Sequence, residues 1–150
     1  MWKDTIKKFF TQSEFGETIS FNEPVNGLSL FEAESMLCIE FPMELKTCLL
    51  ESNGVQGEYG LGLIWDVDRI LDTNLQFRKN MDFTELYMPF DNLLFFADAG
   101  NGDQFFFPIL GNQNVRDDVF VWNHENDSRS WVAPNLKTYF EWWLSGKLTI

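Results

Sequence analysis

The chain has 150 residues, enough for one domain with its own core, and 45% of them are hydrophobic and 17% aromatic, so intrinsic disorder is excluded. Its formal net charge of −12, from 23 acidic and 11 basic side chains, disfavours direct binding to nucleic acid or to an anionic membrane. Such a surface attracts basic partners over about 8 Å at physiological salt; alternatively, it only keeps the protein in solution.

The acidic side chains are unevenly distributed. Residues 14–44 and the stretch between Lys79 and Arg116 contain acidic side chains and no basic ones.

Several other features of the chain bear on its cellular location. The start of the chain, from Met1 to Asp4, is charged rather than apolar, and no window approaches the roughly 18 apolar residues that a membrane span needs. Two cysteines are too few for a disulfide framework. We therefore expect a reduced, cytoplasmic protein without a membrane-spanning segment.

Two helices are expected before residue 40. The first runs from Trp2 to about Gln12, because its aromatic and aliphatic side chains recur at helical spacing. The second begins at a capping box formed by Ser29 and Glu32, in which each side chain pairs with a backbone N–H that the helix leaves free. This helix is expected to end at about Leu37.

A third helix is expected in the segment FPMELKTCLLESNG. Pro42 suits the first turn of a helix, where its missing N–H costs nothing. Leu45, Cys48 and Leu49 share one face. Gly54 readily takes the left-handed conformation that ends helices.

A short apolar strand, Leu61 to Trp65, leads into a fourth helix. Asp66 is suited to be the N-cap of this helix, because its carboxylate can accept hydrogen bonds from the first turn. The residues that align on the apolar face of the helix are Val67, Ile70, Leu71 and Asn74.

The second half of the chain changes to strand-like runs separated by turn residues. These runs are residues 93–97, 104–108, 119–122 and 130–132. The connections at residues 98–103 and 123–128 are typical of hairpin loops. A last helix opens at Pro134 and ends at Gly146. Its apolar stripe consists of Leu136, Tyr139, Phe140, Trp143 and Leu144.

This order of elements predicts an α+β fold in a single domain over residues 1–150. An antiparallel β-meander forms the sheet, and helices pack on it.

The ordered set of segments resembles the SUKH superfamily, the Smi/Knr-type domain, over nearly the whole chain. The segments that carry the resemblance are FPMELKTCLLESNG, YGLGLIW, VDRILDTN, YMPF, LLFFADAGNGDQFFF, VFVWNHE and WVAPNLKTYFEWWLSG. The segment GETISFNEPVNG, residues 16–27, does not take part in it.

The resemblance implies a non-enzymatic binding protein. Bacterial members of the superfamily resemble immunity proteins, which neutralise polymorphic toxins by stoichiometric binding, and many of these toxins are nucleases. Fungal relatives regulate cell-wall synthesis, so a regulatory scaffold that binds an endogenous enzyme is the alternative. The charge favours the immunity role, because a nuclease domain must be basic to hold phosphate and an acidic inhibitor is steered toward it.

Candidate catalytic chemistry depends on His124, the only histidine. Glu125 and Asp127 are near enough in sequence to orient its ring. However, His124 lies in an expected loop, and the chain has no serine or cysteine nucleophile in a recognisable motif. A structural or surface histidine is therefore expected, and no catalytic residue is assigned.

Metal and cofactor sites are also not expected. Asp98, Asn101 and Asp103 supply oxygen atoms around two glycines, but their spacing does not follow an EF-hand loop and turn chemistry explains it. Cys38 and Cys48 are not spaced as in a redox or zinc motif, so we expect buried thiols.

The predicted partner surface combines acids near the sheet and its loops with tryptophans that flank the last hairpin. Its residues are Asp98, Asp103, Asp117, Asp118, Glu125, Asp127, Trp122 and Trp131. Exposed tryptophans are frequent anchors of protein interfaces; alternatively, these two cover the sheet edge or pack internally. The partner expected there is a basic toxin domain.

Overall fold

The computed structural model describes residues 1–11 and 18–150. Its α-helices are α1 (Trp2–Phe10), α2 (Gly27–Leu37), α3 (Met43–Glu51), α4 (Val67–Lys79), α5 (Met81–Leu86) and α6 (Leu136–Ser145). Its strands are β1 (Ser20–Phe21), β2 (Val55–Gln56), β3 (Gly62–Ile64), β4 (Leu93–Asp98), β5 (Gln104–Leu110), β6 (Asn114–Val115), β7 (Val119–Trp122) and β8 (Arg129–Ala133). Two 3₁₀ turns cover Glu58–Gly60 and Gly111–Gln113. The fold is α+β, as the sequence predicts.

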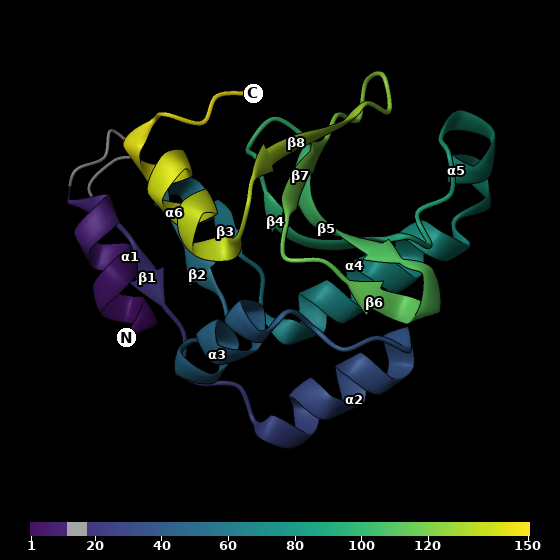
Figure 1. The fold of residues 1–150 in the computed structure, drawn as a ribbon. Helices are drawn as coiled ribbons and strands as arrows, with labels where there is room; N and C mark the ends of the chain where they lie inside the picture. The colour runs from purple at the N-terminus through teal and green to yellow at the C-terminus, as the bar shows by residue number, and fades with distance from the viewer. Residues whose placement is uncertain (12–17) are drawn as a thin grey trace.

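The strands form two antiparallel sheets (Figure 1). The small sheet has the order β1-β2-β3, and the large sheet has the order β4-β5-β7-β8, with β6 paired to β5. The four long strands of the large sheet follow chain order, so the predicted antiparallel meander is confirmed. The backbone N–H of Trp65 donates to the carbonyl of Phe96 at 2.8 Å, which joins the end of β3 to β4.

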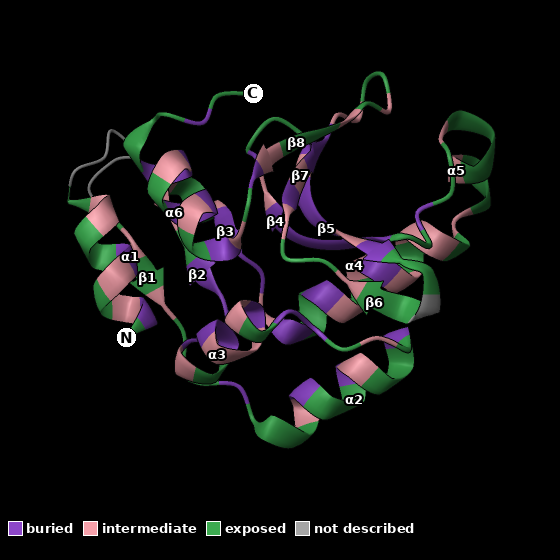
Figure 2. Ribbon diagram, viewed as in Figure 1, coloured by how far each residue is buried: buried purple, intermediate pink, exposed green. Residues whose placement is uncertain are grey.

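The helices cover the sheets in pairs. Helices α1 and α6 pack against each other beside the small sheet, and α2 packs against α4 (Figure 1). Strands β4, β5 and β7 of the large sheet are mostly buried, whereas β8 and α5 are mostly exposed or half-buried (Figure 2). The predicted stripe of α6 is fully confirmed: its buried residues are Leu136, Tyr139, Phe140, Trp143 and Leu144. The Tyr139 hydroxyl donates to the carbonyl of Leu63 at 2.8 Å, so α6 is also tied to β3.

Several helix ends lie where the sequence places them. Asp66 is the N-cap of α4, and its carboxylate accepts from the N–H of Arg69 at 2.8 Å. Gly146 takes a left-handed conformation with φ of 79° and ends α6. Helix α1 ends at Phe10, and the expected end at Gln12 lies outside the described residues.

Two helix starts differ from the prediction. Helix α2 begins at Gly27 rather than Ser29, because Asn26 is the N-cap and its side-chain oxygen accepts from the N–H of Leu28 at 2.7 Å. Asparagine is as good an N-cap as serine, and it comes earlier in the chain. Helix α6 is capped in the same way by Asn135, the residue after the expected Pro134.

The third helix is shorter than its sequence signals suggest. Pro42 is the N-cap rather than a residue of the first turn, and the helix ends at Glu51. Gly54 has a positive φ of 100° but lies beyond the helix, where a Cβ atom would come within 3.0 Å of the backbone nitrogen of Asp66. The glycine therefore permits a close approach of two segments instead of ending the helix.

Two glycine substitutions are expected to have opposite effects on stability. A Cβ atom at Gly62 would lie 2.7 Å from Trp65 Cδ1 and 2.8 Å from Asp98 Oδ2, whereas a Cβ atom at Gly27 meets nothing within 4 Å. We expect Gly62→Ala to lower the free energy of unfolding by about 2 kcal/mol through overpacking. Gly27→Ala should raise it by about 0.5 kcal/mol, because alanine restricts the unfolded chain. Urea denaturation measures the free energy of unfolding of both variants. If Gly62→Ala is as stable as Gly27→Ala, β3 shifts to make room for the added methyl group and the overpacking argument is wrong.

Candidate functional site

Two loops of the large sheet are joined by Asp103. The side chain lies in the loop between β4 and β5 and is only 6% exposed. Its Oδ1 atom lies 2.6 Å from Nδ1 of His124 and accepts from the backbone N–H of His124 at 3.1 Å. The ring of His124 covers Gly102, where a Cβ atom would lie 2.8 Å from the ring carbon Cε1. Asp103 therefore holds the two hairpin loops together, and because its side chain is buried, the structure does not favour it as a contact for a partner.

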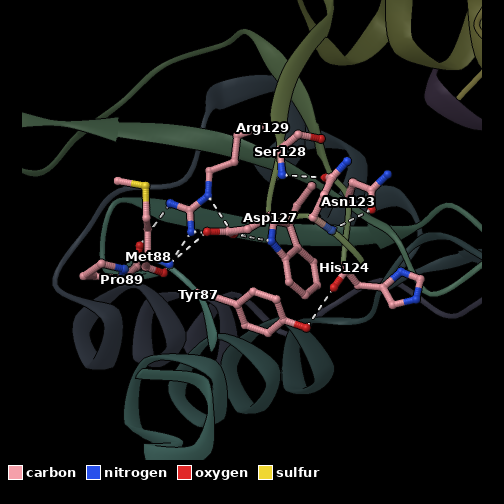
Figure 3. A network of polar contacts seen from close by, with 10 residues as sticks. Tyr87, Met88, Pro89, Asn123, His124, Asp127, Ser128 and Arg129 are labelled. Atoms are coloured by element: carbon pink, nitrogen blue, oxygen red, sulfur yellow. Dashed lines mark hydrogen bonds and ion pairs between the residues drawn. The ribbon is translucent and has the colours of Figure 1, made fainter. Parts of the chain in front are cut away.

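Asp127 is the centre of a second network, at the end of the β7–β8 loop (Figure 3). Its carboxylate accepts from the N–H of Met88 at 2.9 Å, from the indole N–H of Trp122 at 2.8 Å and from Arg129 at 3.0 Å. Burial alone would raise the pKa of Asp127, but these three hydrogen bonds outweigh it and the pKa is lowered. The carboxylate is thus already committed to internal partners.

Trp122 belongs to the core rather than to a partner surface. It is 3% exposed and packs edge-to-face against Tyr87 and Phe90, with ring centroids 5.1 and 5.3 Å away. The pairing of β7 with β5 and β8 directs this side chain inward. Trp122 therefore packs internally, and the structure does not favour it as a contact for a partner.

The same network fixes the segment that follows α5 (Figure 3). The Tyr87 hydroxyl donates to the carbonyl of His124 at 2.8 Å, and Arg129 donates to the carbonyls of Met88 and Pro89 at 2.9 and 3.1 Å. These contacts join residues far apart in the sequence. No local pattern in the sequence indicates them, so the analysis of separate motifs missed Arg129.

Asp98 also has a structural role. It accepts from Arg69 at 2.9 Å and from the backbone N–H of Gly62 at 3.3 Å, and its side chain is 21% exposed. These bonds connect β4 to α4 and to β3. Its remaining accessible surface is small, so the structure does not favour it as a contact for a partner.

Three of the remaining predicted residues form an acidic edge, which we define as Asp117, Asp118 and Trp131. Strand β8 lies at the edge of the large sheet. Trp131 is 50% exposed on this strand, and its indole N–H donates to Asp118 at 2.9 Å. Asp117 is exposed beside it. The last predicted residue, Glu125, is exposed in the loop at the other end of β7.

Trp131 is held in place from behind by α6. The ring of Trp142 packs edge-on against it, with centroids 6.4 Å apart. Trp142 therefore faces away from the buried stripe of α6, to which its neighbour Trp143 belongs. Together with the bond to Asp118, this contact restricts the rotamers of a large exposed aromatic ring.

A hollow of about 690 Å³ lies next to Asp117. Residues 40–43 from the start of α3 and residues 111 and 113–115 of the β5–β6 connection line it together with Asp117. Glu40 is exposed at this hollow, and Glu44 is half-buried nearby. Burial raises the pKa of Glu44, and the nearby Asp117 carboxylate raises it further. The backbone N–H groups of Lys137 and Leu136 lower the pKa, but by less, so it stays above its usual value. The sequence analysis missed these two glutamates as neighbours of Asp117.

The described residues offer little for covalent chemistry. His124 is oriented by Asp103 rather than by Glu125 or Asp127. Burial raises the pKa of the Cys48 thiol to about 12, so it is no nucleophile at neutral pH. Cys38, expected to be buried, is exposed at the left-handed end of α2.

Metal ligation has no obvious place in the described part of the chain. No group of three or more His, Cys, Asp or Glu side chains is arranged there to hold a metal ion. The loop that contains Asn101 is explained by turn chemistry, because the Asn101 side chain accepts from the N–H of Asp103 at 3.0 Å and Gly100 and Gly102 have positive φ.

None of the helices described for residues 1–11 and 18–150 is long and apolar enough to cross a membrane.

Comparison with known families gives one match. The family model SUKH_6, described as SMI1-KNR4 cell-wall, matches residues 28–140. The match begins directly after residues 16–27, which the resemblance of the sequence motifs also leaves out. No curated protein matches the chain.

Proposed function

Because the chain belongs to the SUKH (SMI1-KNR4) family, we propose that it is a non-enzymatic binding protein of the immunity type. Its partner in this proposal is a basic toxin domain, such as a nuclease, which it neutralises by stoichiometric binding. The observation that carries the proposal is the acidic edge, where a half-exposed tryptophan is held by Asp118 and by the ring of Trp142.

Electrostatics supports a basic partner. The chain carries a net charge of −12, and such a field accelerates the approach of a basic protein while it repels phosphate and anionic lipid. Asp117 and Glu125 are exposed acids without an ion pair among the described residues. A toxin domain that binds phosphate presents a positive surface, and an acidic protein that covers this surface excludes the substrate without any chemistry.

Trp131 supports the same surface as the anchor of the interface. Tryptophan is enriched among the residues that dominate binding energy, particularly where the ring is already held in its bound rotamer. Asp118 satisfies the indole N–H and Trp142 supports the ring. Binding therefore loses little side-chain entropy and leaves no polar atom of the indole unpaired.

An immunity gene lies beside the gene of its toxin, so the proposal is tested with the toxin domain that this role requires in the neighbouring gene. Trp131→Ala is expected to raise the dissociation constant roughly tenfold or more, because it removes a preorganised anchor. Asp117→Lys should slow association roughly fivefold and weaken its salt dependence. Interferometry at low and high salt measures both, and co-expression with the toxin measures protection of growth.

Two matched controls accompany these variants. Tyr59→Ala removes another exposed aromatic ring, and Asp72→Lys raises the net charge as much as Asp117→Lys at an exposed site on α4. Both should bind almost as the wild type does. If the controls weaken binding as strongly, the acidic edge is not the interface. If the wild-type chain neither binds nor protects, the immunity role is wrong.

A regulatory scaffold for a cell-wall enzyme is the second candidate, and the cell-wall description of the matching family favours it. Affinity co-purification from the native cells at low and high salt separates the two roles. A stoichiometric basic partner that is lost at high salt supports immunity. An acidic or neutral enzyme of cell-wall synthesis supports regulation.

A further inference from the structure

The side of α2 that faces away from the protein is unusually apolar. Leu28, Phe31 and Met36 are 63%, 65% and 59% exposed, and they share this side with Glu32 and Ser35. We call these five residues the outer face of α2. Figures 1 and 2 show this helix at the bottom of the molecule with a largely exposed outer side, away from β8. The outer face shares no residue with the acidic edge, although the hollows beside the two surfaces have Glu40 and Gln113 in common.

The opposite side of α2 already makes the contacts that hold the helix in the fold. Leu30, Ala33 and Leu37 are buried there, and α2 packs against α4. A surface helix that only packs on a core is polar on its outer side. Large apolar side chains on both sides of α2 therefore indicate that the outer face is covered by a partner.

The charge around the outer face is mostly negative. No lysine or arginine occurs between Lys8 and Lys46, and Glu32 forms no ion pair with any residue in the described ranges. The last turn of α2 carries no basic residue of its own, but Lys46 of α3 pairs there with Glu34 and Glu40. Glu32 is therefore the acid of the outer face that stays without an ion pair.

A hollow of about 530 Å³ adjoins the outer face at the carboxyl end of α2. Phe31 and Ser35 form part of its lining, together with Glu34 and Glu40. Lys46 contacts these two glutamates at 3.2 and 2.7 Å. The side chain of Glu40 is nevertheless 80% exposed, so its carboxylate remains open to a further cation.

We propose that the outer face of α2 binds a basic amphipathic helix of a partner protein. Apolar side chains of that helix pack on Leu28, Phe31 and Met36, and its lysines or arginines reach Glu32 and Glu40. Helix α2 has 11 residues, about 16 Å in length, which suits a partner helix of about three turns. Apolar residues at helical spacing are what such recognition uses.

A second copy of this chain does not fit the surface as well. A symmetric contact between two α2 helices brings Glu32 of one copy close to acidic side chains of the other, in a chain whose net charge is −12. Repulsion between like charges opposes this pairing. Charge complementarity therefore selects a basic partner, and this proposal does not rest on the immunity function.

The test uses a fluorescent synthetic peptide of about 15 residues, with leucines on one helical face and lysines on the other. The full chain is titrated into this peptide and fluorescence anisotropy is measured. The double variant Leu28→Gln/Phe31→Gln is expected to raise the dissociation constant roughly tenfold. Glu32→Lys should weaken binding of this peptide and favour a peptide in which glutamates replace the lysines.

A matched control removes similar exposed apolar surface elsewhere. Leu86 and Met88 are 69% and 66% exposed near the end of α5, and the double variant Leu86→Gln/Met88→Gln should bind the peptide as the wild type does. Because all four side chains are largely exposed, both double variants are expected to fold, which circular dichroism confirms for each preparation.

Several outcomes would overturn the proposal. It fails if the control variant weakens binding as much as the α2 variant, or if a scrambled peptide of the same composition binds equally well. It also fails if the wild-type chain sediments as a dimer that Phe31→Gln dissociates, because the occupant would then be a second copy.

Discussion

Asn74→Ala is expected to lower the free energy of unfolding by about 3 kcal/mol. Asn74 lies on α4, is 1% exposed and makes three hydrogen bonds. Its Oδ1 accepts from the N–H of Phe95 at 2.8 Å, and its Nδ2 donates to the carbonyl of Phe95 at 2.9 Å and to that of Ile70 at 2.7 Å. The side chain thus takes the place of a neighbouring strand along this part of β4.

The size of this effect follows from what alanine leaves behind. Both backbone polar groups of Phe95 lose this partner inside the protein, and a buried unpaired group costs about 1–3 kcal/mol. Urea denaturation at pH 7 measures the change. Asn126→Ala is the matched control, because Asn126 is exposed and accepts one backbone hydrogen bond, from Ser128 at 2.9 Å. A loss below 1 kcal/mol for Asn74→Ala would mean that Phe95 finds other partners.

Asp127→Asn is expected to lower the free energy of unfolding at pH 7 by about 2 kcal/mol. The substitution keeps the shape of the side chain, and asparagine tolerates the positive φ of 61° at this position. However, it removes the negative charge opposite Arg129 and weakens the bonds from Met88 and Trp122. The loss in the free energy of unfolding therefore measures the contribution of the hydrogen bonds and the ion pair drawn in Figure 3, and not backbone strain.

The same variant changes the response to acid. The pKa of Asp127 is lower in the folded chain than in the unfolded chain, so its ionised form stabilises the fold above about pH 4. This contribution is lost as the pH falls through the folded-state pKa. We expect Asp127→Asn to flatten the stability curve between about pH 5 and pH 2. Part of the slope should remain, because the pKa of Glu51 is also lowered.

Asp72→Asn is the control for this experiment. Asp72 is an exposed acid on α4, so its neutralisation should leave both the free energy of unfolding and its pH dependence almost unchanged. Denaturation curves at several pH values between 2 and 8 give both quantities. Identical acid responses of the wild type and Asp127→Asn would show that Asp127 is not ionised in the network.

The main elements could be predicted because their signals are local. The β-meander follows from apolar runs separated by turn residues, and the N-cap at Asp66 follows from contacts within one helical turn. The errors at helix starts are also local. Asn26 and Ser29 are both competent caps, and the sequence contains no preference strong enough to choose between them.

The short elements could not be predicted because long-range contacts maintain them. Strands β1, β2 and β6 have two residues each, too few for a periodic pattern. Helix α5 buries none of its residues, so it has no apolar stripe to detect. These segments take their conformation from the strands and loops beside them.

The predicted site shows the same division most clearly. The family and fold class of the chain could be predicted from the order of its motifs, and the excess of acids from its composition. Motif order and composition do not depend on how distant segments of the chain meet. Which acids remain free was decided only by the tertiary structure. Asp103 pairs with His124 in another loop, Asp127 accepts hydrogen bonds from Trp122, Arg129 and Met88, and Trp122 lies in the core. Asp117 and Trp131, in contrast, stay accessible at a sheet edge. Similar side chains have different roles because burial and hydrogen bonding are set by residues far away in the chain.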